Sequence, residues 1–447
     1  MKSRQEPTAD SQPQRPRLLF INRSYWPDVE ATGQLLTELC EDLAADFDVT
    51  VICGRARTVV EDVPPGAEQL DERRGVQIRR VRHTQFNKAS FVGRLANMLT
   101  FQMAATWSAL FAPRFDLVVV ETDPPFLCLL GRLLQVLRRV PLVCYLQDIY
   151  PDVAVALGKL RPGLLARLLR SAFFHVYRRS DAVVVLSRDM QNLLIEGGVP
   201  AEQVHVIPNW IDTDLVHPIK DANRFRHLHG LDDRFVVMYS GNLGLSQNLT
   251  QVLEAAAHVR NCEQIVFAFI GSGADRPNLE RIAREKGLTN VRFFDYQPKA
   301  ELADSLSAAD VHLVVLQPQI RRLLMPSKLY GALASGTPVL AITAGDCELA
   351  EIVEQHDLGR VVSNGQVAEL ADAVRTMSTS PATLHRQATN ARQFAESHCT
   401  RAVSVARLQV LFSQSLQLRP DSSSNPAIAT SPTNSATAVK CCVVQNS

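Results

Sequence analysis

The residues best suited to hold an anionic ligand are glycines that follow two buried strand-like runs. The strings YSGNLGLSQN (239–248) and FIGSGADRP (269–277) each place glycines after apolar residues and before a helical segment. Glycine lets the backbone approach a diphosphate, and the next helix N-terminus offers free N–H groups. A tight strand-to-helix turn without a ligand uses glycine in the same way. The candidate binding residues are Gly241, Asn242, Leu243, Gly244 and Gly271.

A lysine lies close to the expected start of a helix in RRLLMPSKLYGALASGTPVLA (321–341). Pro326 suits the first helical position, and Gly336 suits the position just past the helix end. Lys328 is therefore expected in the first turn. A cation is disfavoured there by the helix dipole, which indicates an anion nearby. A solvent-facing lysine is the alternative.

The first half of the chain offers a carboxylate at a similar strand end. In YLQDIYPD (145–152), Asp148 follows an apolar run and could bind a substrate hydroxyl or accept its proton. A helix-cap or turn aspartate is the alternative. The loop SYWPDVEATGQ (24–34) follows the first run, so we expect it to line the same cleft together with Asn22 and Tyr25, with Gly33 opening the first helix.

Short apolar runs alternate with segments of helical periodicity along most of the chain. The runs fall at 18–21, 49–53, 116–120, 142–146, 182–186 and 204–207, and again at 235–239, 264–270, 291–294, 311–316 and 338–342. Continuous Val, Leu and Ile runs are typical of strands covered on both faces. The pattern predicts an α/β protein with two Rossmann-like, doubly wound parallel-sheet domains facing a central cleft.

The length of 447 residues also favours two domains. A Pro- and Asp-bearing stretch at 208–220 marks the expected boundary. We expect domains at 17–208 and 209–418, with the last helices packing back toward the first domain. The polar tails at 1–16 and 419–447 are expected to be disordered.

Charge is balanced overall but unevenly distributed. The formal net charge of +1 gives no general attraction to nucleic acid. Residues 73–115 and 153–180 contain basic residues and no acidic ones, which suits an anionic membrane surface, with a solvated basic face as the alternative. The uncharged run at 95–113 is compatible with a core-facing helix, a helix in the membrane interface or a spanning helix.

Cysteine spacing and the N-terminus bear on location and cofactors. The nine cysteines show no zinc-site spacing, and no pair of aspartates flanks a strand end to chelate a diphosphate-bound ion. The first residues lack the apolar segment of a signal peptide. We expect a cytoplasmic protein, peripheral on the cytoplasmic face of the inner membrane, that needs no metal or other cofactor.

Several strings together resemble the retaining GT-B glycosyltransferases of family four, in particular the branch with colanic-acid and fucosamine transferases. They are SYWPDVEATGQ, LQDIYPDVAVALG, VIPNWID, SGNLG, GSGADRPNLE and MPSKLYGALASGTPV, and the likeness spans residues 18–410. The resemblance implies transfer of a hexosyl or N-acetylaminosugar group from a nucleoside diphosphate sugar to an acceptor hydroxyl, with retention and without metal. It also implies a role in cell-surface polysaccharide synthesis, such as O-antigen or exopolysaccharide. The acceptor is expected to be a polyprenyl diphosphate-linked sugar or a polysaccharide.

The resemblance also assigns roles to individual positions. Gly241–Gly244 and Gly271 would flank the donor diphosphate and nucleoside, and Gly33 and Asp148 would face the reacting sugar and acceptor. The residues that would hold the nucleotide are Pro326, Ser327, Lys328 and Leu329.

Three positions depart from the family pattern. The family's pair of glutamates falls on Leu323 and Gly331, and a lysine common after the first glycine turn falls on Gln247. Lys328, Arg321 or Arg322 would then neutralise the diphosphate, and Glu348 would supply the carboxylate.

Other classes of protein compete with this interpretation. A non-hydrolysing sugar-nucleotide 2-epimerase has the same two-domain architecture, but the basic stretches favour a separate membrane-borne acceptor. A non-catalytic scaffold or nucleotide-binding subunit is favoured by the two replaced glutamates. An NAD enzyme would need a GxGxxG turn after the first strand, and INRSYWPD contains none.

Overall fold

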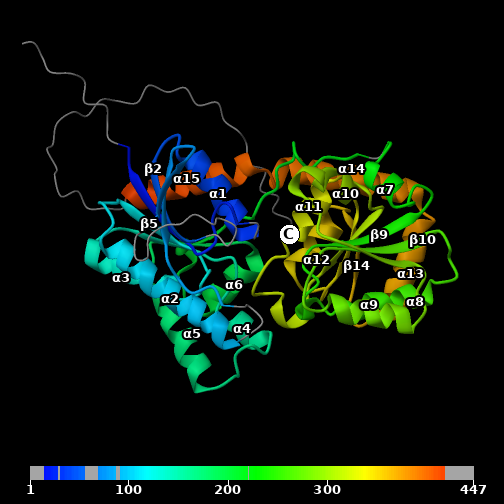
Figure 1. Ribbon diagram of the computed structural model, residues 1–447, viewed down its shortest axis with the longest axis horizontal. Coiled ribbons are helices and arrows are strands. Elements are labelled where there is room, and N and C mark those ends of the chain that lie inside the picture. The colour runs from blue at the N-terminus through cyan, green and yellow to red at the C-terminus, as the bar shows by residue number, and fades with distance from the viewer. Residues whose placement is uncertain (1–14, 29–30, 56–68, 87–90, 220, 418–447) are drawn as a thin grey trace, which may run out of the picture.

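The computed structural model describes residues 15–28, 31–55, 69–86, 91–219 and 221–417. Nearly all of both expected tails therefore lies outside the described residues. Two parallel-sheet α/β domains lie side by side and are joined across the top of Figure 1 by α14 and α15.

The first sheet has the strand order β3-β4-β2-β1-β5-β6-β7-β8 and is parallel except for β3, which pairs antiparallel with β4. Its strands are β1 (Arg17–Ile21), β2 (Asp48–Gly54), β3 (Gln69–Arg73), β4 (Val76–Val81), β5 (Leu117–Val120), β6 (Leu142–Tyr145), β7 (Ala182–Val185) and β8 (Val204–Val206). Its helices are α1 (Ala31–Leu43), α2 (Phe91–Leu110), α3 (Leu127–Arg138), α4 (Asp152–Ala156), α5 (Leu164–Tyr177), α6 (Arg188–Glu196) and η1 (Ala201–Gln203).

The second sheet is wholly parallel with the order β11-β10-β9-β12-β13-β14. Its strands are β9 (Phe235–Ser240), β10 (Ile265–Ile270), β11 (Val291–Phe294), β12 (Val311–Val315), β13 (Val339–Ile342) and β14 (Gly359–Val362). The helices are α7 (Arg224–Leu228), η2 (Leu245–Gln247), α8 (Thr250–His258), α9 (Arg276–Glu285), η3 (Lys299–Glu301), α10 (Leu302–Ser307), η4 (Pro318–Ile320), α11 (Lys328–Ala334), α12 (Glu348–Gln355), α13 (Val367–Ser378), α14 (Pro381–His398) and α15 (Arg401–Gln417). The α/β class with two parallel-sheet domains is confirmed.

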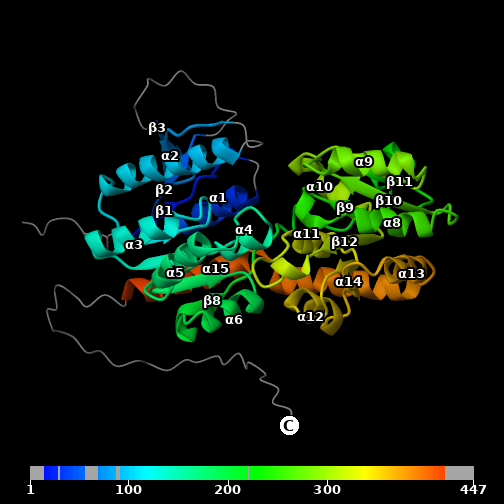
Figure 2. The same cartoon turned by 90° about the horizontal axis from the view of Figure 1, so that it is seen from below.

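The central strands of each sheet are buried because helices cover both faces of the sheet (Figure 2). In β9, Val237 and Tyr239 pack into the cluster formed with α8 and α13, whereas Val236 and Met238 pack beside α7. Side chains on a strand alternate between faces, so an apolar run without polar interruption fills two layers at once.

The sequence analysis missed β3, β4 and β14, which lie at or next to a sheet edge. Strand β4 reads VQIRRV and β14 reads GRVV, so polar residues interrupt the apolar pattern where neighbours cover less of the strand. The expectation that Pro326 opens a helix is also wrong. Helix α11 begins at Lys328, and Pro326 instead accepts a turn hydrogen bond from the Leu329 amide at 3.2 Å.

Helix α15 returns from the second domain onto the first and lies beside α1 and β5 (Figure 1). Phe412 meets Phe20 of β1 edge-on, with ring centroids 5.9 Å apart. One apolar cluster runs from the first sheet through Trp210 and Val216 of the connecting segment into α11, α14 and α15. The two domains therefore share buried apolar contacts at their junction.

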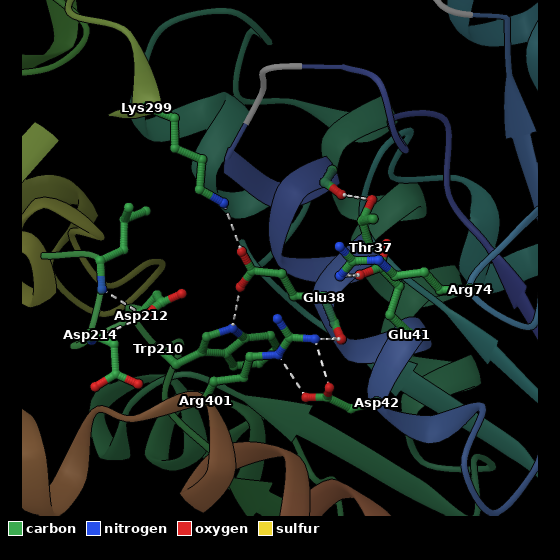
Figure 3. Close-up of polar contacts among 12 residues, drawn as sticks. Thr37, Glu38, Glu41, Asp42, Arg74, Trp210, Asp212, Asp214, Lys299 and Arg401 are labelled. Atoms are coloured by element: carbon green, nitrogen blue, oxygen red, sulfur yellow. Dashed lines mark hydrogen bonds and ion pairs between the residues drawn. The ribbon is translucent and has the colours of Figure 1, made fainter. Parts of the chain in front are cut away.

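Polar contacts tie the connecting segment and the second domain to α1 (Figure 3). The Glu38 carboxylate accepts hydrogen bonds from Trp210 Nε1 at 2.9 Å and from Lys299 Nζ at 3.1 Å. Arg401 of α15 pairs with Asp42 one turn further along α1. These contacts fix α1 relative to the second domain.

Candidate functional site

The two glycine turns pack directly on each other at the carboxyl ends of β9 and β10. Gly241 and Gly271 have φ angles of 130° and 132°, which side-chain-bearing residues rarely adopt. A Cβ on Gly271 would lie 2.1 Å from the Gly241 carbonyl oxygen, and one on Gly273 would lie 2.2 Å from that of Leu243. Glycine is therefore required at these positions, and the turns form one unit at the edge where open α/β sheets bind ligands.

Lys328 lies against this unit. Its Cε is 2.6 Å from where a Cβ on Gly241 would stand, and its Nζ is 5.2 Å from the ring centroid of Tyr239. Burial disfavours the charged ammonium and lowers the pKa of Lys328 to about 8. Lys328 has no carboxylate partner within the described part of the chain. This combination suits an anionic ligand bound at the glycine turns.

The first glycine turn also holds an unsatisfied acceptor. The Gln247 side-chain Oε1 is buried without a hydrogen-bond partner among the described residues and lies 2.9 Å from the Cβ position of Gly244. Its backbone carbonyl accepts a hydrogen bond from Gln317 Nε2 at 3.1 Å. A buried acceptor of this kind gains free energy when a ligand hydroxyl donates to it.

Asp148 meets the second domain directly. It follows β6 and forms an isolated antiparallel bridge with Leu324, and the next amide, that of Ile149, donates to the Leu323 carbonyl at 2.9 Å. Burial raises the pKa of Asp148 to about 6, partly opposed by the positive charge of Lys159. The structure therefore brings the backbone of Asp148 in the first domain to the segment that leads into Lys328.

The loop after β1 differs from expectation. Asn22 and Tyr25 are fully buried, so the expectation that their side chains line the cleft is wrong. Tyr25 packs in the first-domain core. A Cβ on Gly33 would lie 3.2 Å from Ser24, so Gly33 allows α1 to approach this loop closely.

Glu348 starts α12 and is engaged by the first domain. Its carboxylate accepts a hydrogen bond from Arg188 Nε at 3.2 Å and another from the Arg188 amide, while its own amide donates to Asp189 at 2.8 Å. Burial raises the pKa of Glu348, and the contacts with Arg188 oppose that shift. Glu348, which the sequence predicts to supply a carboxylate at the sugar-donor site, therefore lies at the contact between the domains.

The remaining predicted residues lie in several different environments. Leu243 and Leu329 are buried in the core, and the Leu243 amide and carbonyl already pair with Ser272 and Asp275. Asn242 and Ser327 are exposed, and Pro326 is half-buried. Arg321 pairs with Asp346 at 2.8 Å and lines a cavity whose lining includes neither the glycine turns nor Lys328.

Sequence reasoning missed a second carboxyl group at the edge of the first sheet. Glu121 directly follows β5 and is buried, and its Oε2 has no hydrogen-bond partner among the described residues. Burial and the nearby Asp123 raise the pKa of Glu121 well above its usual range. The acidic ETD string after an apolar run was the signal that could have identified it.

Known families and structures share this architecture. Residues 32–215 match the family described as Glycosyltransferase Family 4, and residues 220–394 match Glycosyl transferases group 1. The structure of HepE from Anabaena in complex with UDP superposes with a TM-score of 0.68 over 89% of this chain and 100% of that one, at 18% identity. WaaG, described as a glycosyltransferase involved in lipopolysaccharide biosynthesis, superposes with a TM-score of 0.64 over 88% of this chain and 99% of that one, at 17% identity.

Two parallel-sheet Rossmann-like domains that meet at the carboxyl ends of their strands define the GT-B class of fold.

Curated relatives give the family. The putative colanic acid biosynthesis glycosyl transferase WcaI of Escherichia coli K12 is 32% identical over 286 residues, which cover 62% of this chain and 69% of that protein. The probable glycosyltransferase WbjE of Pseudomonas aeruginosa is 32% identical over 250 residues, covering 56% and 62%. The chain belongs to the family-four glycosyltransferases with the GT-B fold.

Proposed function

We propose that this protein transfers a hexosyl or N-acetylaminosugar group from a nucleoside diphosphate sugar to an acceptor hydroxyl, with retention of anomeric configuration, in cell-surface polysaccharide biosynthesis. The lysine held against the paired glycine turns is the observation that carries the donor class. The structures of HepE in complex with UDP and with UDP-glucose support a nucleotide donor. The name of WcaI supports a polysaccharide pathway, of which O-antigen and exopolysaccharide synthesis are the candidates.

In the proposed reaction the glycine turns hold the donor diphosphate, and Lys328 neutralises charge that grows on the leaving group. A fixed cation in a partly dry site stabilises that charge more strongly than water would. The reaction is proposed to need no metal or other cofactor. Gln247 is positioned to accept a hydrogen bond from a donor hydroxyl.

Asp148 is proposed to contact the acceptor. Its backbone bridges Leu324 of the second domain, and its raised pKa makes the carboxylate a stronger proton acceptor than that of an exposed aspartate. Gly33 contributes by letting α1 approach the loop after β1.

The test of this function uses a panel of sugar nucleotides. A donor present at 100 times its dissociation constant adds ~2.7 kcal/mol of stability, so a thermal shift identifies the nucleotide. The identified donor should then be turned over with release of its nucleoside diphosphate, and this should persist in EDTA. Activity that is lost in EDTA and restored by magnesium or manganese contradicts metal independence.

A non-catalytic nucleotide-binding subunit is the second candidate. The positions of the family's glutamate pair hold Leu323 and Gly331, and Leu323 is buried while Gly331 lies within α11. The observation that separates the two is nucleotide binding without any turnover, which supports the subunit. If the sugar of the donor is altered when no acceptor is present, the protein is instead a sugar-nucleotide 2-epimerase.

We also propose that the first domain docks peripherally on an anionic cytoplasmic membrane and that the acceptor is a polyprenyl diphosphate-linked sugar. Within the described residues, no helix combines the length and apolar character needed to cross a bilayer. Helix α2 packs Phe101 and Ala105 into the core but turns a second apolar side outward.

The outward side belongs to a larger surface, here called the apolar face. Helix α2 contacts α3 and α3 contacts α5, and the three lie together on the lower side of the first domain in Figure 1. Its side chains are 39% to 74% exposed and are Val92, Leu95, Leu99, Met103, Trp107, Phe111, Leu129, Leu133, Val136, Leu137, Leu164, Leu165 and Leu168.

The charges around the apolar face favour a lipid surface. The sequences of α2, α3 and α5 contain five arginines and no acidic residue: Arg94, Arg132, Arg138, Arg167 and Arg170. Apolar side chains that insert among headgroups, flanked by basic residues, are typical of helices that lie in the membrane interface.

A further inference from the structure

We infer that the cavity between α4, α5 and η4 binds the diphosphate of a polyprenyl-linked acceptor, at a site separate from the donor diphosphate; this rests on the proposed function. The cavity has a volume of about 640 Å³ and lies between the two domains. Its lining joins α4 and α5 of the first domain to the segment 318–323 of the second.

Basic residues dominate the polar part of the lining. Four arginines line the cavity against a single aspartate, and these residues are Arg167, Arg170, Arg321, Arg322 and Asp152. Guanidinium groups are the side chains best matched to phosphate oxygens, which they bind through paired N–H donors. Three of the four arginines already have carboxylate partners: Arg170 pairs with Asp152, Arg321 with Asp346 and Arg322 with Glu196. The excess positive charge of the lining is therefore that of Arg167, and it favours an anion.

Two of these arginines retain donor capacity for a ligand. Arg167 is exposed and has no ion-pair partner within the residues that the structure describes. Arg321 pairs with Asp346 through Nη2 and with the Pro318 carbonyl through Nη1, but its Nε is buried without a hydrogen-bond partner among the described residues. A buried unpaired donor costs free energy that a phosphate oxygen would recover.

The N-terminal end of α5 adds to this environment. Helix α5 begins after Gly163 without a side-chain cap, and Gly163, Ala166 and Arg167 all line the cavity. The uncapped amides and the helix dipole favour negative charge at this end. Here they act together with the arginines of both domains.

The position of the cavity fits an amphiphilic acceptor. Leu164, Leu165 and Leu168, which belong to the apolar face, lie on the same turns of α5 as the lining residues Ala166 and Arg167. A lipid whose hydrocarbon chain rests on the apolar face would reach the cavity with its headgroup. The surface of α5 therefore changes from apolar to basic within one turn of helix. This matches the hydrocarbon chain and the charged headgroup of a polyprenyl diphosphate.

Residues near Asp148 on both sides of its bridge with the second domain also line the cavity. Pro151, three residues after Asp148, lines the cavity on one side, and Leu323 lines it on the other. The Leu323 carbonyl accepts the hydrogen bond from Ile149, the residue after Asp148. A sugar attached to a diphosphate in this cavity would extend toward Asp148 along either segment.

Farnesyl diphosphate is the probe for this site, measured by titration in the presence of the nucleoside diphosphate that the donor panel identifies, at saturation, so that the donor site is occupied. Wild type should bind it, and Arg167→Gln should bind ~10-fold more weakly or worse, as expected for the loss of one charge-assisted contact. Arg167→Glu should weaken it further. Arg260→Gln, which changes an exposed arginine of the second domain, should match wild type.

Two further ligands separate the chemical contributions. Inorganic diphosphate should bind less tightly than farnesyl diphosphate and show the same dependence on Arg167, whereas farnesol should bind without that dependence. Equal affinity of farnesyl diphosphate for wild type and both Arg167 variants would overturn the inference, as would its displacement by the nucleoside diphosphate. Failure of the proposed function is read separately, from the absence of nucleotide binding and of sugar-nucleotide turnover across the whole donor panel in wild type.

Discussion

At the scale of single residues, Lys328 is the side chain on which the proposed binding of the donor diphosphate depends most. Replacing it with Ala removes a charge-assisted hydrogen bond worth about 1.5 to 3 kcal/mol, or ~10- to 150-fold in nucleotide affinity. The Lys328→Ala protein should fold, because alanine is a good helix former. UDP and GDP titrations measure the effect, with the exposed Lys286→Ala as the matched control. Equal affinities in all three proteins contradict an anion-binding role.

The lowered pKa of Lys328 adds a pH signature. In the free protein the ammonium deprotonates as the pH rises through about 8. A bound diphosphate stabilises the charged form and raises that pKa, so binding takes up a proton above pH 8 and affinity falls as the pH increases. Wild type should show this decline and Lys328→Ala should not. A parallel decline in both proteins would assign the effect to another group.

Asp148 gives a second prediction at the same scale. With a pKa of about 6, its carboxylate is ionised at neutral pH and becomes protonated as the pH falls through 6. Turnover that needs the ionised form should therefore fall below pH 6. Asp148→Asn should lose this acid limb and raise the acceptor KM, while UDP affinity stays unchanged. An unaltered pH profile in Asp148→Asn would remove Asp148 from the reaction.

At the scale of elements, the two glycine turns form one packed structural unit, independent of their proposed role in binding the donor. A Cβ on Gly271 would meet the Gly241 carbonyl oxygen at 2.1 Å in a backbone conformation with φ of 132°. Gly271→Ala should cost ~1–3 kcal/mol of unfolding free energy, because overpacking and strain act together. Urea denaturation measures this cost.

Gly287 provides the matched control for that experiment. Its φ is 62°, so it is also in the left-handed region, but a Cβ there would have nothing within 4 Å. Gly287→Ala should therefore be less destabilising than Gly271→Ala and should leave UDP affinity unchanged. Similar losses of stability in the two variants would show that the contact with Gly241 does not matter.

The apolar face is tested at the scale of its three helices. The double variant Met103→Glu, Trp107→Glu introduces two acidic side chains at positions where the native side chains are 72% and 68% exposed. The fold should therefore tolerate it. Pelleting with anionic vesicles should fall sharply in this variant and should weaken with salt in wild type, since exposed charges are screened beyond ~8 Å at physiological ionic strength. Leu228→Glu, on α7 of the second domain and 65% exposed, is the control. Equal pelleting of wild type with neutral and anionic vesicles would contradict an electrostatic contribution to membrane binding.

At the scale of the whole molecule, the sequence predicted the architecture better than the site. Eleven strands appear in the sequence as apolar runs, most of them central strands whose two faces are covered by helices, whereas β3, β4 and β14 carry polar residues at or near sheet edges. The burial of Asn22 and Tyr25 depends on how α1 folds over the loop after β1, which local pattern does not encode. The pairing of Arg188 with Glu348 joins residues 160 positions apart and needs both domains in place.

The contacts between the domains join residues that are far apart in the sequence, so no local motif predicts them. Glu38 accepts hydrogen bonds from Trp210 of the connecting segment and from Lys299 of the second domain (Figure 3). Asp148 reaches the segment before Lys328 by pairing with Leu324. The candidate site is therefore a product of domain arrangement, and its two halves appear in the sequence as unrelated strings.

The most direct test of the central claim is release of nucleoside diphosphate from the preferred sugar nucleotide, measured with a polyprenyl diphosphate-linked sugar on anionic vesicles. Wild type should release one nucleoside diphosphate for each sugar transferred, with the anomeric configuration retained in the product. Lys328→Ala should lose at least as much turnover as binding, because charge on the leaving group grows in the transition state. Nucleotide binding by wild type with no release from any donor in the panel would contradict the account.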